Sequence, residues 1–443
     1  MSKTGIDTVL RLRLRHRPGQ LAQVALAIAA EQGLLGEITT LRIGEEHTVR
    51  DVTVETRSEE HTARVVEAVR HVEGAELVAV TDRVFERHRG GKIRSARRVS
   101  VEQMSDLRAI YTPGVARVVR AIEKDPALAW DLTAIGLSVG IFTNGSRVLG
   151  LGNVGPLASL PVMEGKAVLY DQFVGLSATP ILVDTLDRQE FVDTVCRISR
   201  GFGAIHLEDI RSPDCYWIED ELDRRLDKPV MHDDQHGTAT VALAALLNAS
   251  HMAGKDLRTV RVGQIGLGAA GSAIARLLIA YGVRDVLVTD PTPEAVERLT
   301  RLGARAVDTD TLMRESEVVV AATGRPGLIT PERVRPGQVI LSLSNPEPEI
   351  DPDQALAAGA AFASDGRSIN NALAYPGLFR GALEVRSRAV TTDMMLAAAT
   401  AIAESAEAGE LVPSPLQVGL HSEVTRAVAA SATKSGLAGT LKL

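Results

Sequence analysis

A glycine-rich turn after a short apolar run constrains this chain more than any other feature. Residues 260–271 read VRVGQIGLGAAG, in which Gly266, Gly268 and Gly271 follow a strand-like stretch and precede a helical one, SAIARLLIAYG. The first glycine permits a tight turn, the second lets a pyrophosphate approach the backbone, and the third lets the helix pack against the strand. The start of that helix offers free N–H groups to phosphates. The pattern predicts a dinucleotide-binding βαβ unit.

The choice between NAD and NADP depends on Asp290, which ends the next strand-like run, DVLVTD. A carboxylate there accepts hydrogen bonds from a ribose 2′-hydroxyl and repels a 2′-phosphate, so it favours NAD over NADP. Because Pro291 follows, Asp290 could instead begin a helix, and NADP stays open. Two further apolar runs, EVVVAAT and GQVILSLS, are expected to extend a parallel sheet, whose strand ends face bound ligands.

The chain has 443 residues, which is too long for one ordinary domain. Residues 1–85 present strand-like and helical patterns in the order β-α-β-β-α-β, a ferredoxin-like arrangement. A basic, glycine-bearing stretch over 86–98 is expected to be a linker. We then expect an α/β catalytic and metal domain over 99–237. A Rossmann-type, doubly wound NAD-binding domain with C-terminal helices should occupy 238–443.

The N-terminal order, with Pro18-Gly19 directly after the first strand, resembles the ACT regulatory domain. The resemblance implies a regulatory role and a small-molecule effector, which the sequence does not identify. A dimerising module without a ligand is the alternative, because this fold serves many unrelated roles.

Composition excludes several classes of protein. The formal charge of −7 gives no reason to expect nucleic-acid binding. Two cysteines, Cys196 and Cys215, provide neither a disulfide framework nor a thiolate metal site, which indicates a reducing compartment. No stretch approaches the roughly 18 apolar residues of a membrane span, and charges fill the N-terminal segment where a signal peptide is apolar. We expect a cytoplasmic protein without membrane or nucleic-acid partners.

Two pairs of carboxylates follow apolar runs in the same predicted domain. Glu208 and Asp209 come after GAIHL, and Asp233 and Asp234 come after KPVMH. Neighbouring residues of a strand point to opposite faces, so Glu208 and Asp209 can reach one ion only where the strand ends and bends. Either pair alone could be solvated or could cap a helix. Together they predict a site for Mg²⁺ or Mn²⁺, which prefer oxygen ligands.

Zinc is the alternative metal at this place. His232 and His236 flank the second pair of carboxylates at i, i+4 spacing. This spacing crosses an expected turn, and no third soft ligand is evident.

Two residues are candidates for proton transfer. Lys166, in LPVMEGKAVLYDQF, is expected in the first turn of a helix, where the helix dipole and partial burial would lower its pKa and yield a neutral amine. Tyr111, in AIYTPGVARVV, lies on a loop, and a phenol near a metal can protonate an enolate. A surface lysine and a tyrosine packed over the Pro-Gly turn are the alternatives.

These motifs occur in a specific order: YTPGVA, SRVLGLGNVG, PVMEGKAVLYDQFVG, HLEDIRSPD, HDDQHGTA, GLGAAG, SNP and NNALAYPG. The order resembles the malic enzyme family in its short bacterial form, from about Val99 nearly to the C-terminus. It implies a homo-oligomer that oxidatively decarboxylates L-malate to pyruvate and CO₂ with a nicotinamide cofactor and Mg²⁺ or Mn²⁺. The alternatives are a dehydrogenase that does not decarboxylate and a ligand-sensing protein on an enzyme scaffold.

The resemblance also implies a role for each matching residue. Asn153 departs from the pattern, because many relatives carry aspartate there, and its role is left open. The implied roles are general acid for Tyr111, general base for Lys166, a tuning neighbour for Asp233, metal ligation for Glu208, Asp209 and Asp234, pairing with a malate carboxylate for Arg147, and substrate hydrogen bonding for Asn345 and Asn371.

Overall fold

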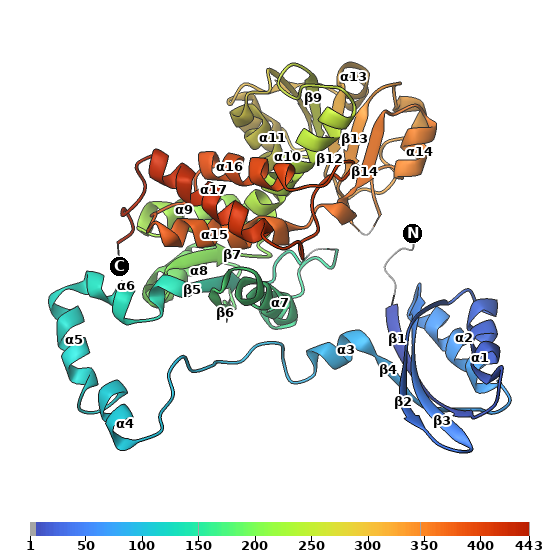
Figure 1. Ribbon diagram of the computed structural model, residues 1–443. Helices are drawn as coiled ribbons and strands as arrows, with labels where there is room; N and C mark the ends of the chain where they lie inside the picture. Colours follow the sequence, from blue (N-terminus) through green and yellow to red (C-terminus); the bar gives the residue numbers. More distant parts are fainter. Residues whose placement is uncertain (1–5, 149, 346, 443) are drawn as a thin grey trace. The chain divides into compact units, whose positions relative to one another are not determined.

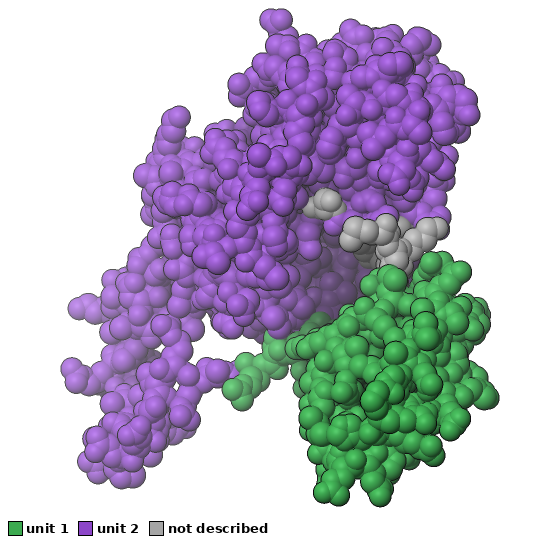
Figure 2. Space-filling view, turned by 45° about the vertical axis from the view of Figure 1, so that its right-hand side comes forward, with its two compact units in different colours: residues 1–94 green, residues 95–443 purple. Residues whose placement is uncertain are grey.

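The computed structural model describes residues 6–148, 150–345 and 347–442. The chain divides into two compact units, unit 1 (residues 1–94) and unit 2 (residues 95–443), which Figure 2 shows in different colours. Over the described ranges, no helix combines the length and the apolar character needed to cross a bilayer.

Unit 1 is an antiparallel sheet with two helices packed on one face (Figure 1). Leu10, Leu12 and Leu14 alternate along the first strand and are buried, whereas Arg11 and Arg13 between them are exposed. This alternation gives the sheet one apolar face, which the helices cover. The strand order is β2-β3-β1-β4, and the expected β-α-β-β-α-β sequence of elements is present. The elements are β1 (Ile6–Arg15), α1 (Gln20–Ala30), β2 (Leu34–Ile43), β3 (His47–Thr56), α2 (Glu59–Arg70), β4 (Ala75–Asp82) and α3 (Arg83–His88).

The first sheet of unit 2 is parallel, in the order β6-β5-β7-β8. Ile141 of β5 packs in one core cluster with Met163 of α7, and Phe142 packs in another with Val195 of α8 and Leu222 of α9. The sheet is therefore covered on both faces, as parallel sheets usually are. Its elements are β5 (Ser138–Thr143), α7 (Pro156–Val174), β6 (Ser177–Leu182), α8 (Arg188–Ile198), β7 (Ala204–Leu207), α9 (Asp214–Arg225) and β8 (Val230–His232).

The second sheet of unit 2 has six parallel strands in the order β11-β10-β9-β12-β13-β14. The chain reverses its winding direction between β9 and β12, which is the switch point of a doubly wound fold. The predicted Rossmann-type domain is confirmed. Its elements are β9 (Arg261–Ile265), α11 (Ala269–Tyr281), β10 (Asp285–Thr289), α12 (Pro293–Thr300), β11 (Arg305–Ala306), α13 (Thr309–Glu315), β12 (Val318–Ala321), β13 (Val339–Ser342), α14 (Pro352–Ala357) and β14 (Phe362–Asp365).

Alanine-rich helix α10 (Asp233–Met252) follows β8 directly and packs against α11 and against α16 (Thr392–Glu404). Its buried alanines, such as Ala242 and Ala245, leave room for the neighbouring helices to approach closely. The remaining helices of unit 2 are α4 (Met104–Ile110), α5 (Val115–Lys124), α6 (Ala129–Leu132), α15 (Tyr375–Glu384) and α17 (Leu420–Lys434).

Candidate active site

Four carboxylates meet at one edge of the first sheet. Strands β7 and β8 pair in parallel, with Leu207 opposite His232, so Glu208 and Asp233 leave the sheet at the same edge. Asp209 has a φ of 55°, which bends the chain where β7 ends and lets two successive carboxylates face one point. Ligand atoms of Glu208, Asp209 and Asp234 all lie within 4.8 Å of one another.

The electrostatics of this cluster fit a divalent cation. Burial, together with the neighbouring carboxylates, raises the pKa of Glu208 and of Asp209 and raises the pKa of Asp234 to about 6. Oδ2 of Asp209 and Oδ1 of Asp233 are buried and make no hydrogen bond. Crowded, buried carboxylates are more stable as anions when a cation lies among them. Their oxygen donors match the preference of Mg²⁺ and Mn²⁺.

Lys166 lies beside these carboxylates. Its Nζ is 2.5 Å from Oδ2 of Asp233 and 3.0 Å from Oε1 of Glu208. The expectation of a first-turn lysine with a lowered pKa is wrong, because α7 begins ten residues earlier, at Pro156. Burial by itself lowers the pKa of Lys166, but the charges of Asp233 and Glu208 outweigh burial and raise this pKa well above its usual value.

Asn371 and Gly237 complete the surroundings of Asp233. The Nδ2 atom of Asn371 donates to Oδ2 of Asp233 at 3.2 Å, and its Oδ1 accepts from the Thr238 hydroxyl at 3.0 Å. A Cβ atom at position 237 would overlap Oδ1 of Asp233, so any other residue there would displace this carboxylate. Asn371, predicted to bind substrate, therefore lies next to the residue that contacts Lys166.

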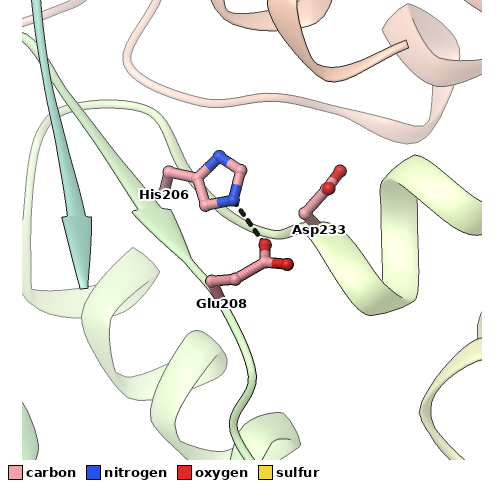
Figure 3. A group of neighbouring side chains, drawn as sticks. All are labelled: His206, Glu208 and Asp233. Atoms are coloured by element: carbon pink, nitrogen blue, oxygen red, sulfur yellow. Dashed lines mark hydrogen bonds and ion pairs between the residues drawn. The ribbon is translucent and has the colours of Figure 1, made fainter. Parts of the chain in front are cut away.

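Two neighbours of the carboxylates were not predicted from the sequence. His206 lies on β7, and its Nε2 is 2.7 Å from Oε2 of Glu208, as Figure 3 shows. The alternation of strand side chains could have indicated it, because residues two apart share a face. Glu219 of α9 accepts hydrogen bonds from the backbone N–H of His232 and from Gln235, and so anchors the start of α10. No sequence pattern marks Glu219.

The zinc alternative receives no support from the geometry. Nε2 of His236 lies 2.9 Å from the Glu219 carboxylate. Over residues 6–148, 150–345 and 347–442, the two groups that could hold a metal ion include neither His232 nor His236.

The glycine-rich turn has the backbone that its sequence predicts. Gly266 has a φ of 84°, and a Cβ atom on Gly271 would overlap the Gly266 carbonyl oxygen. A Cβ on Gly268 would meet nothing within 4 Å, so the backbone is open where a pyrophosphate would approach. Asp290 accepts hydrogen bonds from Leu267 N at 2.7 Å and from Thr292 N at 2.8 Å. Asp290 therefore ties the end of β10 to the turn.

Two other predicted residues, Arg147 and Asn345, are exposed on loops, as is Asn153, whose role was left open. The backbone N–H of Arg147 donates to the Asp209 carbonyl at 3.0 Å, which places Arg147 next to the carboxylates. Asn345 follows β13 in the second sheet, beside Gly366. Asn153 is exposed in the loop before α7, and no described contact assigns it a role.

The structure does not bring Tyr111 to the carboxylates. The residue as a whole is 66% exposed, whereas the side chain of Lys166 is largely buried, at 13% exposed. Among the described residues, no hydrogen bond or ring contact joins Tyr111 to Lys166 or to the carboxylates. Neither α4 nor α5, which flank Tyr111, has a buried residue, and Figure 1 shows both helices apart from the sheets of unit 2.

The fold and the site together define a class of protein. A Rossmann-type sheet beside a buried lysine and a cluster of carboxylates is the arrangement of a nicotinamide-dependent oxidoreductase with a hard-metal site. Residues 91–223 match the family model of the malic enzyme N-terminal domain, and residues 232–325 match that of the NAD-binding domain of D-isomer specific 2-hydroxyacid dehydrogenases.

Comparison with known proteins identifies the family. NAD-dependent malic enzyme 1 of Bacillus subtilis is 50% identical over 93% of this chain and 94% of its own length. The NAD-dependent malic enzyme of Geobacillus stearothermophilus is 39% identical over 84% of this chain and 83% of its own. The malic enzyme structure from Pyrococcus horikoshii has a TM-score of 0.75 at 39% identity, over 80% of this chain and 89% of its own. The chain belongs to the malic enzyme family.

Proposed function

We propose that this protein oxidises and decarboxylates L-malate to pyruvate and CO₂, with NAD as hydride acceptor and Mg²⁺ or Mn²⁺ as metal. The observation that carries the proposal is the position of Lys166, whose Nζ lies between Asp233 and Glu208 at the carboxylate cluster. A lysine held there can exchange a proton with a hydroxy acid bound at the same cluster.

The residues of the chain would divide the reaction between them. The charges of Glu208 and Asp233 hold a proton on Lys166. A cation at Glu208 would offset part of this charge, so that Lys166 could take the proton of the malate hydroxyl while Asp233 orients the amine. The Arg147 guanidinium pairs with a malate carboxylate, and Asn345 and Asn371 hydrogen-bond the substrate. After hydride has left C2 for NAD and CO₂ has left C3, Tyr111 would give a proton to C3, which yields pyruvate.

Two bound groups would supply the chemistry that side chains lack. A divalent ion held by Glu208, Asp209 and Asp234 supplies a Lewis acid that favours loss of CO₂. NAD, held at Gly266, Gly268 and Gly271, supplies the hydride acceptor.

The first test follows NADH and NADPH absorbance with purified protein, L-malate and Mn²⁺. We expect metal-dependent NADH formation, with pyruvate and CO₂ as products and no activity after EDTA treatment. Oxaloacetate as the final product, without CO₂, would instead identify a dehydrogenase that does not decarboxylate. Activity that persists in EDTA would contradict the metal site.

Asp290 provides a test of cofactor choice. In Asp290→Ser we expect the ratio of kcat/KM for NAD over NADP to fall about tenfold or more, because a hydrogen bond to the ribose and a repulsion of the 2′-phosphate are both lost. Asp285→Ser removes a carboxylate from the opposite end of the same strand and should leave the ratio unchanged. If the ratio is unaltered in folded Asp290→Ser, Asp290 stabilises the glycine-rich turn and does not determine the choice of cofactor.

Exposed apolar side chains around Tyr111 support a homo-oligomer. Val101, Met104, Ile110 and Val119 are between 44% and 64% exposed, which is unusual for a segment of about 20 residues. We therefore propose that this segment packs on a second copy of the chain, where Tyr111 enters the partner's carboxylate site. The proposal explains why Tyr111 is exposed although its role needs contact with the substrate.

Unit 1 is proposed to be a regulatory, ACT-like domain. Its support is the β-α-β-β-α-β order and the turn at Gly19, which precedes α1. A small-molecule effector bound there would act on the activity of unit 2.

A further inference from the structure

Two buried side chains without a role in the proposed reaction, Tyr170 and His206, form a chain of hydrogen bonds that leads to Glu208 and Lys166. The Tyr170 hydroxyl is 2.8 Å from Nδ1 of His206, and Nε2 of His206 is 2.7 Å from Oε2 of Glu208. The other oxygen of Glu208 is 3.0 Å from Nζ of Lys166. Tyr170 follows Lys166 by four residues on α7, so the chain returns to the helix from which it starts.

The His206 ring is held by its neighbours. It stacks on Phe379 at 5.6 Å between centroids and meets the edges of Tyr375 and Tyr170 at 5.4 and 5.8 Å. The side chain is fully buried, so no water can replace Tyr170 or Glu208 as a partner of the ring nitrogens. Rotation of the ring would break both hydrogen bonds at once.

The direction of these hydrogen bonds follows from the partner of each nitrogen. Nε2 of His206 faces one oxygen of Glu208, whose other oxygen pairs with the Lys166 ammonium, and Nδ1 faces the Tyr170 hydroxyl. A neutral imidazole donates through one nitrogen and accepts through the other. The Glu208 carboxylate, paired with Lys166, accepts a hydrogen bond, so Nε2 donates to Glu208 and Nδ1 accepts from the Tyr170 hydroxyl.

This arrangement distinguishes the two groups of side chains that could hold an ion. One group is His206, Glu208 and Asp233, and the other is Glu208, Asp209 and Asp234. A histidine that ligates a metal must offer a nitrogen lone pair. Since Nδ1 accepts from Tyr170 and Nε2 donates to Glu208, His206 has no lone pair to offer. Glu208, Asp209 and Asp234 therefore remain as the candidate metal ligands, and His206 contacts Glu208 from behind.

We infer that His206, backed by Tyr170, is a positioning residue that fixes the carboxylate of Glu208 for the metal and for Lys166. The inference rests on the proposed function, because it takes Glu208 as a metal ligand. Hydrogen bonds from a second layer of residues orient metal ligands in the same way elsewhere, and their loss typically weakens metal binding about 10- to 100-fold.

The test measures Mn²⁺ affinity by electron paramagnetic resonance, without malate or NAD, and NADH affinity by fluorescence. His206→Phe keeps a flat ring but removes the donor, so we expect Mn²⁺ to bind about 10- to 100-fold more weakly. His206→Gln keeps an N–H near the position of Nε2 and should restore most of the affinity. NADH affinity should be unchanged in both variants, because the glycine-rich turn belongs to the second sheet.

Two further variants provide a second test of the inference and a control for the loss of a buried histidine. Tyr170→Phe removes only the hydroxyl and should weaken Mn²⁺ binding several-fold, which decides the question if His206→Phe does not fold. His421→Phe is the matched control, since His421 is also buried and stacked on a phenylalanine, Phe173. Wild-type Mn²⁺ affinity in folded His206→Phe, or in Tyr170→Phe when His206→Phe does not fold, would overturn the inference. A wild-type protein that binds no Mn²⁺ would instead refute the metal site of the proposed function.

Discussion

Replacement of Lys166 by alanine is expected to lower kcat by roughly 10²- to 10⁴-fold, the contribution of a positioned general base. The amine contacts Asp233 and Glu208, and no other described lysine or arginine forms an ion pair with either carboxylate. NADH binding should be retained, because the glycine-rich turn lies in the other domain of unit 2. Steady-state kinetics with malate and NAD, together with NADH fluorescence, measure both quantities.

A matched control separates catalysis from stability. Lys228 is also buried, and its Nζ donates to the carbonyls of Ser199 and Phe202. Lys228→Met should lower the melting temperature by leaving these carbonyls without a donor, yet keep kcat. Small primary amines should restore part of the activity of Lys166→Ala, because they can occupy the space of the missing amine. Wild-type turnover in Lys166→Ala would refute the role of Lys166.

The second prediction concerns the chain that supplies Tyr111. Tyr111→Phe and Lys166→Ala should each be nearly inactive alone. If Tyr111 acts on the partner subunit, mixed dimers of the two variants contain one site with both residues intact. Random mixing makes half of the dimers mixed, so activity should rise to about a quarter of the wild-type value.

Mixed dimers give no active site if Tyr111 acts within its own chain, because each chain then carries one defect. The two variants should therefore be refolded together or co-expressed with different affinity tags, and the doubly tagged species should be assayed. Doubly tagged protein without added activity would contradict the exchange of Tyr111 between copies. Wild-type activity of Tyr111→Phe alone would refute its role as the acid.

The Rossmann-type domain was predictable because its signals are local. The glycines at 266, 268 and 271 act through their own backbone angles and the absence of a side chain, which sequence shows directly. Alternating leucines in the first strand predicted the apolar sheet face of unit 1 for the same reason. The pairing of carboxylates with the ends of two apolar strands also predicted where Glu208 and Asp233 meet.

The residues that surround the site could not be predicted in the same way, because they are brought together by contacts between distant segments of the chain. The pKa of Lys166 was predicted to fall, but residues 42 and 67 positions later supply the charges that raise it. His206 is oriented by a hydrogen bond with Tyr170, which lies on another element. Glu219, on α9, accepts a hydrogen bond at the start of α10. Burial, pairing and hydrogen-bond direction are properties of the packed chain, and no local pattern encodes them.

The sequence by itself determined the family, the glycine-rich turn, the two pairs of carboxylates after apolar strands and the order of elements, because these depend on residue type and near neighbours. Only the tertiary structure decided that Lys166 lies in the middle of a helix, that the ring of His206 is held between Tyr170 and Glu208, and that Tyr111 is exposed. Each of these follows from which segments pack together, and packing depends on side chains far apart along the chain.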